Sequence, residues 1–210
     1  MYPKLVVFDI DGTLLPDTTI ARHMAAHLGD LPLIDELEDG WANHKVDHEE
    51  FAVRSAASYA GHNLKTLADA AATLPTIEGA AQVVRVLRET GCSVILATMS
   101  MAFAARVLAA KLGCHDAKGT ELEMNGDMFT GKISAFNYET DKAVYACRYG
   151  EKLGIQKQDI AAIGDSRADI PLFAEAGRAI ALNATPDAIE AADQAINTRE
   201  LTDILPLLEQ

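Results

Sequence analysis

Short apolar runs alternate with amphipathic stretches over most of the chain. Runs rich in apolar and β-branched residues predict buried strands at 5–8, 93–98, 160–163 and 178–182. Apolar positions three or four residues apart predict helices at 79–89, 101–112, 141–153, 169–176, 186–192 and 201–208. Such an alternation is typical of α/β proteins with a doubly wound, Rossmann-like parallel sheet. Only 121–134 differs, because its Asn125-Gly126 pair predicts a β-hairpin.

The stretch between the first two strands has another pattern. It contains no strand signal, and its apolar spacing predicts four helices, at 18–28, 33–41, 47–59 and 63–74. Asp47 and Asn63 stand where helix N-caps are expected. Four helices exceed what a simple crossover needs, so we expect an inserted helical cap over the end of the first strand. The predicted domains are an α/β core of residues 1–15 and 75–210 and a helical cap of residues 16–74.

The composition is that of an acidic globular protein. Of its 210 residues, 49% are hydrophobic, which is enough for a sizeable core. The formal net charge of −13 disfavours nucleic acid and anionic membranes as partners, because an acidic surface repels both. Cys92, Cys114 and Cys147 lie in separate segments without metal-ligand spacing, which indicates reduced thiols. With no leader-like start and no apolar run long enough to span a bilayer, the sequence predicts a cytoplasmic protein.

Two aspartates, Asp9 and Asp11, follow the first strand directly. Open α/β sheets bind ligands at the carboxyl ends of their strands, and residues two apart in an extended chain point to the same side. Two neighbouring carboxylates favour a cation between them, and hard oxygen ligands suit Mg²⁺. Gly12 permits a sharp turn, and Thr13 can donate a hydrogen bond to an anion. The alternative is a solvated Asp-Gly turn.

Polar residues also stand at later strand ends and helix starts. Thr98 ends the second strand, Lys142 begins a helix, and Asp165 and Asp169 follow the strand at 160–163. Singly, these residues have ordinary explanations as a core hydroxyl, a solvated lysine, a turn residue and an N-cap. Together on one doubly wound sheet they indicate a shared site, in which a metal or a lysine would attract an anionic substrate.

These motifs resemble those of a known family. Asp-x-Asp-Gly-Thr, an apolar strand ending in a hydroxyl, a lysine and Gly-Asp-Ser-x-x-Asp are similar to the four motifs of the haloacid dehalogenase superfamily of phosphohydrolases. The resemblance covers about residues 4–15 and 75–205. The helical insertion after the first motif and the Asn-Gly hairpin before the lysine resemble the phosphoserine phosphatase branch.

The resemblance implies a covalent mechanism. Asp9 would attack phosphorus in line and form an aspartyl-phosphate. Asp11 would protonate the leaving alkoxide and then take a proton from the hydrolytic water. Mg²⁺ would be bound by Asp9, by the backbone carbonyl of Asp11 and by Asp165, and would offset the repulsion between nucleophile and phosphate.

The same resemblance implies supporting roles for four further residues. Thr13 and Thr98 would bind phosphoryl oxygens. Lys142 would neutralise charge on the nucleophile and the phosphoryl group. Asp169 would position Lys142 or a metal-bound water.

The sequence departs from the branch where substrate would be bound. The second motif is Thr98-Met99-Ser100, where the branch has a serine and two glycines. Thr18 stands where the branch has a glutamate for the substrate ammonium, and Arg54 is the candidate for a cap arginine that binds the substrate carboxylate. Thr18, Arg54, Met99 and Ser100 therefore join the predicted substrate-binding set, and phosphoserine itself is predicted to be a poor or secondary substrate.

The predicted function is Mg²⁺-dependent hydrolysis of a small phosphorylated metabolite, phosphoserine-like or related, through an aspartyl-phosphate. One alternative is a phosphotransferase that passes the phosphoryl group to an alcohol. Another, from a different class, is a phospho-receiver or regulatory binding protein on the same type of sheet. The sequence leaves the particular phosphomonoester and the oligomeric state open.

Overall fold

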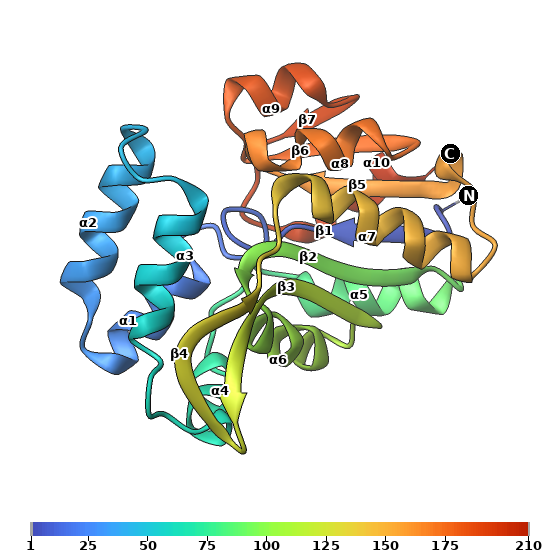
Figure 1. Cartoon of the computed structure of the whole chain (residues 1–210). Coiled ribbons are helices and arrows are strands. Elements are labelled where there is room, and N and C mark those ends of the chain that lie inside the picture. The colour runs from blue at the N-terminus through green and yellow to red at the C-terminus, as the bar shows by residue number, and fades with distance from the viewer. Residues whose placement is uncertain (1, 210) are drawn as a thin grey trace.

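A computed structural model describes residues 2–209, and across this range the strands form one seven-stranded sheet (Figure 1). The order is β4-β3-β2-β1-β5-β6-β7, and neighbouring strands are parallel except for the β3–β4 pair. The strands are β1 (Leu5–Phe8), β2 (Ser93–Met101), β3 (Asp116–Asn125), β4 (Met128–Ala135), β5 (Ile160–Gly164), β6 (Arg178–Leu182) and β7 (Gln194–Ile196). The predicted doubly wound α/β architecture is confirmed.

Helices cover both faces of the sheet because successive strand residues point to opposite sides. Val6 and Phe8 pack in one apolar cluster, with α5 (Ala80–Glu89), α6 (Ala102–Leu112) and α10 (Leu205–Leu208). Leu5 and Val7 pack in the other, with α7 (Glu139–Lys152), α8 (Ile170–Ala174) and α9 (Pro186–Ala191). Three short 3-10 turns, η1 (Lys157–Asp159), η2 (Arg167–Asp169) and η3 (Leu201–Ile204), also belong to this part of the molecule. β1 is thus buried on both faces at the centre of the molecule.

Four helices lie between β1 and α5, and Figure 1 shows α1–α3 beyond the carboxyl end of β1. They are α1 (Ile20–Leu28), α2 (Leu31–Ala42), α3 (His48–Ala57) and α4 (Leu64–Ala71). The predicted N-caps Asp47 and Asn63 are confirmed, since each side chain accepts a hydrogen bond from the backbone three residues on.

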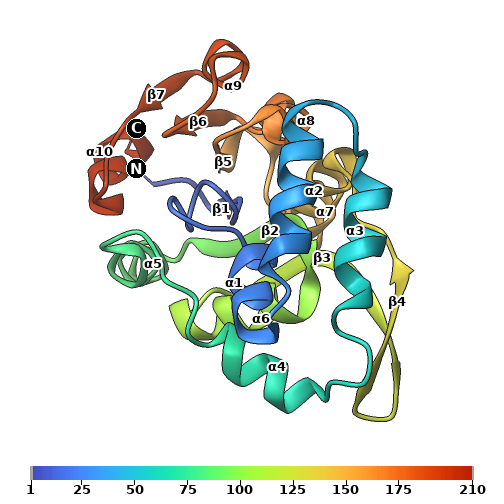
Figure 2. The same ribbon diagram turned by 90° about the vertical axis from the view of Figure 1, so that its left-hand side faces the viewer.

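The inserted helices are anchored to two different apolar clusters. Met24 of α1 and Leu67 of α4 belong to the cluster of the main sheet. Ile34 and Leu37 of α2 instead form a small separate cluster with α1. The turned view in Figure 2 shows α4 beside α6, and α2 beside α3 nearer the viewer. α1 and α4 are therefore continuous with the core, whereas α2 rests on a smaller contact.

The predicted hairpin is present, but β3 begins earlier than expected, at Asp116. Its first half pairs parallel with β2, and only its second half pairs with β4. The hairpin also binds the loop between α3 and α4, where Gly61 N–H donates to Phe129 O (2.9 Å) and Leu64 N–H to Asp127 O (2.8 Å). Gly131 of β4 permits close packing there, because a Cβ atom would lie 2.8 Å from that of Ala60.

Three sequence predictions need correction, one of them the helix predicted at 201–208, which is η3 followed by the short α10. The sequence does not predict β7, because this strand has only three residues and no apolar run. It lies at an exposed edge of the sheet, where apolar residues are not required. The helix predicted at 169–176 is η2 followed by the short α8, because Pro171 removes a backbone donor after the first turn. Within residues 2–209, none of the helices has the length and hydropathy needed to cross a membrane.

Candidate active site

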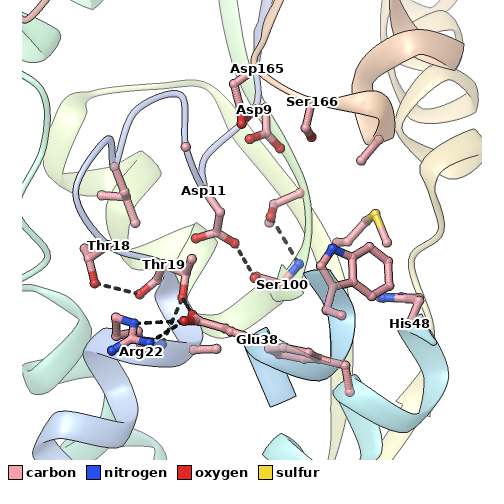
Figure 3. Close-up of a pocket in the computed structure, with 18 of the residues that line it drawn as sticks. Asp9, Asp11, Thr18, Thr19, Arg22, Glu38, His48, Ser100, Asp165 and Ser166 are labelled. Atoms are coloured by element: carbon pink, nitrogen blue, oxygen red, sulfur yellow. Dashed lines mark hydrogen bonds and ion pairs between the residues drawn. The ribbon is translucent and has the colours of Figure 1, made fainter. Parts of the chain in front are cut away.

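The carboxyl ends of β1, β2 and β5 meet at one cavity of about 480 Å³, which the inserted helices cover (Figure 3). β1 is flanked by β2 on one side and β5 on the other, so the chain winds away from it in both directions. This switch point is where open α/β sheets bind ligands. Asp9 follows β1, lines the cavity and is only 4% exposed.

Lys142 forms a buried ion pair with two aspartates. Its Nζ lies 2.6 Å from Asp9 Oδ1 and 2.8 Å from Asp169 Oδ1. The first turn of α7 carries the lysine under the sheet end, where its side chain is 2% exposed. Burial alone would lower the pKa of Lys142, but the carboxylates of Asp169 and Asp9 outweigh it and raise the pKa. The lysine is therefore a fixed cation beside the Asp9 carboxylate.

The loop after β5 adds Asp165 and fixes Asp169. The backbone N–H groups of Asp165 and Ser166 donate to Asp169 Oδ2 at 3.1 and 3.2 Å. The hydroxyl of Thr13 donates to Asp165 Oδ1 at 3.1 Å, which joins this loop to the turn after β1. That turn requires glycine, because Gly12 has φ of +86° and a Cβ atom there would lie 2.3 Å from Asp165 Oδ2.

Asp9, Asp165 and Asp169 form an acidic cluster that could hold a metal ion, with one carboxylate oxygen from each within 4.8 Å of the others. Burial raises the pKa of Asp9, and Asp169 and Asp165 raise it further against the opposing effect of Lys142. Burial and Asp169 likewise raise the pKa of Asp165 to about 7. Hard oxygen donors with a surplus of negative charge fit a small divalent cation such as Mg²⁺.

Asp11 faces the cavity but stands apart from this cluster. Its Oδ1 accepts a hydrogen bond from Ile20 N–H at 2.6 Å, at the start of α1. Its Oδ2 accepts one from the hydroxyl of Ser100, at the end of β2. Burial raises the pKa of Asp11, against the effect of both hydrogen bonds. Ser100 N–H in turn donates to Thr98 Oγ1 at 3.1 Å, so the second motif is tied to the first.

The structure does not bring two predicted substrate-binding residues to the cavity. Arg54 pairs instead with Glu36 (2.8 Å) and Glu50 (3.3 Å), because it lies on the other face of α3. That helix lines the cavity with His48, Phe51, Ala52 and Ser55, at helical spacing. Thr13 is fully buried and its hydroxyl is used by Asp165, so it too is absent from the lining.

The other predicted residues, Thr18, Thr98, Met99 and Ser100, do line the cavity. The sequence did not single out Arg22, Glu38 or Arg167, which also line the cavity. Their positions depend on how α1 packs against α2 and on where the β5 loop points, which a single helical pattern does not reveal.

Asn137 is a further residue that the sequence did not single out, fully buried beside the site. Its Nδ2 donates to Thr98 O at 2.7 Å and its N–H to Thr120 Oγ1 at 3.1 Å. It therefore fixes the end of β2 relative to the start of α7, which carries Lys142.

Metal-free protein is expected to lose stability as the pH rises from about 4 to about 7. The pKa of Asp165 is about 7 in the folded chain and 3.8 as the ordinary value. Between these values the folded chain keeps a proton that the unfolded chain has released, so rising pH favours unfolding until the folded pKa is passed. Thermal melts in EDTA across this range should show the decline for wild type and a weaker one for Asp165→Asn. An equal fall of melting temperature with pH in both proteins would show that Asp165 does not cause the decline.

The fold and the acidic site define a hydrolase of the haloacid dehalogenase type. The chain belongs to the haloacid dehalogenase-like hydrolase family, whose model matches residues 6–174. Within it the chain falls in the phosphoserine phosphatase-like branch, as predicted. It is 28% identical over 206 residues to the phosphoserine phosphatase of Streptomyces coelicolor, covering 98% of this chain and 50% of that protein.

One further relative and two solved structures are also similar to this chain. The phosphoserine phosphatase of Methanocaldococcus jannaschii is 26% identical over 207 residues, covering 98% of both chains. A solved phospho-aspartyl intermediate analogue of phosphoserine phosphatase shares the fold with a TM-score of 0.84 and 24% identity, covering 100% of both chains. A haloacid dehalogenase family hydrolase from Salmonella enterica has a TM-score of 0.89 and 21% identity, covering 100% of this chain and 73% of that one.

Proposed function

We propose that this chain is a Mg²⁺-dependent phosphatase that hydrolyses a small phosphorylated metabolite through an aspartyl-phosphate on Asp9. The observation that carries the proposal is the buried Asp9 carboxylate, held through Oδ1 by Lys142 at 2.6 Å and facing a cavity that Asp11 also lines. A nucleophile and an acid–base group thus share one enclosed space beside a fixed cation. The phosphatase names of the relatives support the same activity.

Asp9 would act as the nucleophile. One carboxylate oxygen attacks phosphorus, and the bond from phosphorus to the ester oxygen breaks as the new bond forms. Lys142 keeps the attacking carboxylate oriented, because its ammonium is itself fixed by Asp169. Thr98, three residues before Met101 at the end of β2, lies at the cavity wall where its hydroxyl can donate to a phosphoryl oxygen.

Asp11 would be the acid–base group. It gives a proton to the departing alkoxide and then takes one from water, whose oxygen attacks phosphorus and releases phosphate from Asp9. The raised pKa of Asp11 suits a group that must hold a proton in the first step. Its bonds to Ile20 and Ser100 hold the carboxylate at the leaving-group side of the cavity.

Mg²⁺ would be bound by the carboxylates of Asp9 and Asp165, with the backbone carbonyl of Asp11. When bound, it supplies positive charge that offsets the repulsion between Asp9 and an anionic phosphate. We further propose the division into a catalytic core of residues 1–15 and 75–210 and a specificity cap of residues 16–74. The placement of α1–α3 over the cavity supports that division.

Purified protein is expected to hydrolyse p-nitrophenyl phosphate with Mg²⁺ and to stop when EDTA is added. The cluster around Asp9 has more carboxylates than cations, so without metal it opposes binding of an anion. Release of nitrophenolate, followed by absorbance, measures the rate. Restoring activity with excess Mg²⁺ controls for damage by the chelator, and hydrolysis that is equally fast in EDTA would contradict the proposal.

A further inference from the structure

A carboxylate from α2, Glu38, lines the cavity on the side away from the sheet (Figure 3). Its Oε2 accepts hydrogen bonds from Nε (2.9 Å) and Nη2 of Arg22, and its Oε1 accepts one from Thr19 Oγ1 at 3.1 Å. Each carboxylate oxygen can accept two hydrogen bonds, so Oε1 keeps one acceptor position. The carboxylate is held in place and can still bind a donor in the cavity.

The charge at this end of the cavity is negative. Arg22 is shared between Glu38 and Asp35, whose Oδ1 lies 2.7 Å from Nη2, so the three groups sum to one negative charge. Asp17, also in the lining, is paired with Arg199 at 3.2 Å. A leaving group that carries a carboxylate would meet repulsion here, whereas an ammonium group would be attracted.

Two other cations line the cavity: Lys142, which pairs with Asp9 and Asp169, and Arg167, which lies against an aromatic ring. The guanidinium of Arg167 lies 5.0 Å from the ring centre of Trp41 and is exposed at the edge of the cavity. Trp41 follows Glu38 by three residues on α2, so both side chains face the cavity from one side of that helix. Phe51 adds a second aromatic side chain to the lining. A carboxylate next to aromatic side chains is the chemistry that binds ammonium groups.

We infer that the cavity selects phosphomonoesters of amino alcohols that lack a carboxylate, with Glu38 as the residue that binds the ammonium group of the leaving group. Arg22 is a positioning residue that holds the Glu38 carboxylate in the cavity. This inference rests on the proposed phosphatase activity and names its substrate class. It also assigns the ammonium contact to α2, whereas the sequence pattern pointed to the position of Thr18.

Two pairs of esters that differ in charge but not in shape test the inference. The first pair is phosphoethanolamine and propyl phosphate, and the second is phosphocholine and its carbon isostere with a tert-butyl group in place of trimethylammonium. Wild type is expected to prefer the charged member of each pair by about tenfold or more in kcat/KM, the size of a charge-assisted contact. Phosphoserine should be hydrolysed less efficiently than phosphoethanolamine.

Glu38→Gln is expected to bring both ratios close to unity, and a ratio is insensitive to the fraction of folded enzyme. Glu36→Gln is the matched control, because Glu36 lies on the same helix but pairs with Arg54 outside the cavity. It should keep the wild-type ratios.

Three results would overturn the inference. Equal rates within each pair, with p-nitrophenyl phosphate still hydrolysed, would reject the substrate class alone. A preference for phosphoserine that Arg167→Met removes would show that the cavity binds a carboxylate instead. Failure to hydrolyse any ester, p-nitrophenyl phosphate included, would reject the phosphatase activity and the substrate class with it.

Discussion

Replacing Asp9 with asparagine is expected to lower kcat for p-nitrophenyl phosphate by about a thousandfold or more, because an amide cannot form the acyl phosphate. The fold should survive, since asparagine has nearly the same shape and Lys142 keeps its contact with Asp169 at 2.8 Å. Wild type, quenched in acid during turnover, should carry phosphate on the protein, and Asp9→Asn should carry none. Turnover and mass spectrometry of the intact protein measure both effects.

Asp159→Asn provides the matched control for this substitution. Asp159 lies just before β5, at the opposite end of the sheet from the cavity, and pairs with Lys4 at 2.8 Å. The same chemical change there should leave turnover near the wild-type value. If Asp9→Asn also kept near-wild-type turnover, or if its melting temperature fell below that of an active variant, the covalent role of Asp9 would lose its support.

Mg²⁺ is expected to raise the melting temperature of wild type by about 5–10 °C at roughly a hundred times its Kd. Binding to the folded chain alone adds about 2.7 kcal/mol at that concentration. For a chain of this size each kcal/mol corresponds to roughly 2–4 °C. The physical reason is the crowding of Asp9, Asp165 and Asp169 around a single lysine, which a cation relieves.

Asp165→Asn should behave differently with and without metal. It removes one carboxylate from the cluster, so the shift with Mg²⁺ should be much smaller than in wild type. In EDTA the variant should melt slightly higher, because one repulsive charge is gone and Thr13 can still donate to the amide oxygen. Differential scanning calorimetry of both proteins in both conditions measures the four values. Equal shifts in the two proteins would mean that Asp165 is not a ligand.

Much of the sheet and its central acidic residues followed from local sequence. Asp9 and Asp11 directly follow a strand that is apolar on both faces. Such strands are typical of the interior of a parallel sheet, where both faces are covered. Lys142 could be placed at a helix start, but its burial between two aspartates depends on how α7 packs against the sheet. The spacing of apolar and polar residues in the sequence does not reveal how α7 packs.

The substrate side of the cavity was harder to predict, for a geometric reason. Arg54 lies one position from Ser55, and on a helix one residue turns the side chain by about 100°. That difference separates the cavity from the outer surface of α3. Arg22 and Glu38 meet only because α1 and α2 pack together, so neither helix pattern alone reveals their pair. Packing between distant segments thus determines which residues reach the substrate side of the cavity, and the sequence motifs do not reveal it.

The main-chain pairing between the β3–β4 hairpin and the loop after α3 limits how the cavity can open. Swinging all four inserted helices outward would break the hydrogen bonds of Gly61 and Leu64 to the β3–β4 hairpin and would expose Met24 and Leu67 to water. α2 is attached by a small apolar cluster, by the ion pairs of Glu38 with Arg22 and of Glu36 with Arg54, and by the Trp41–Arg167 contact, without main-chain bonds to the sheet within residues 2–209. The inserted helices are therefore fixed to the core through α1 and α4, and α2 is the helix that can move most easily. Substrate and phosphate would pass beside α2, so the same helix that carries Glu38 would also control their exchange with solvent.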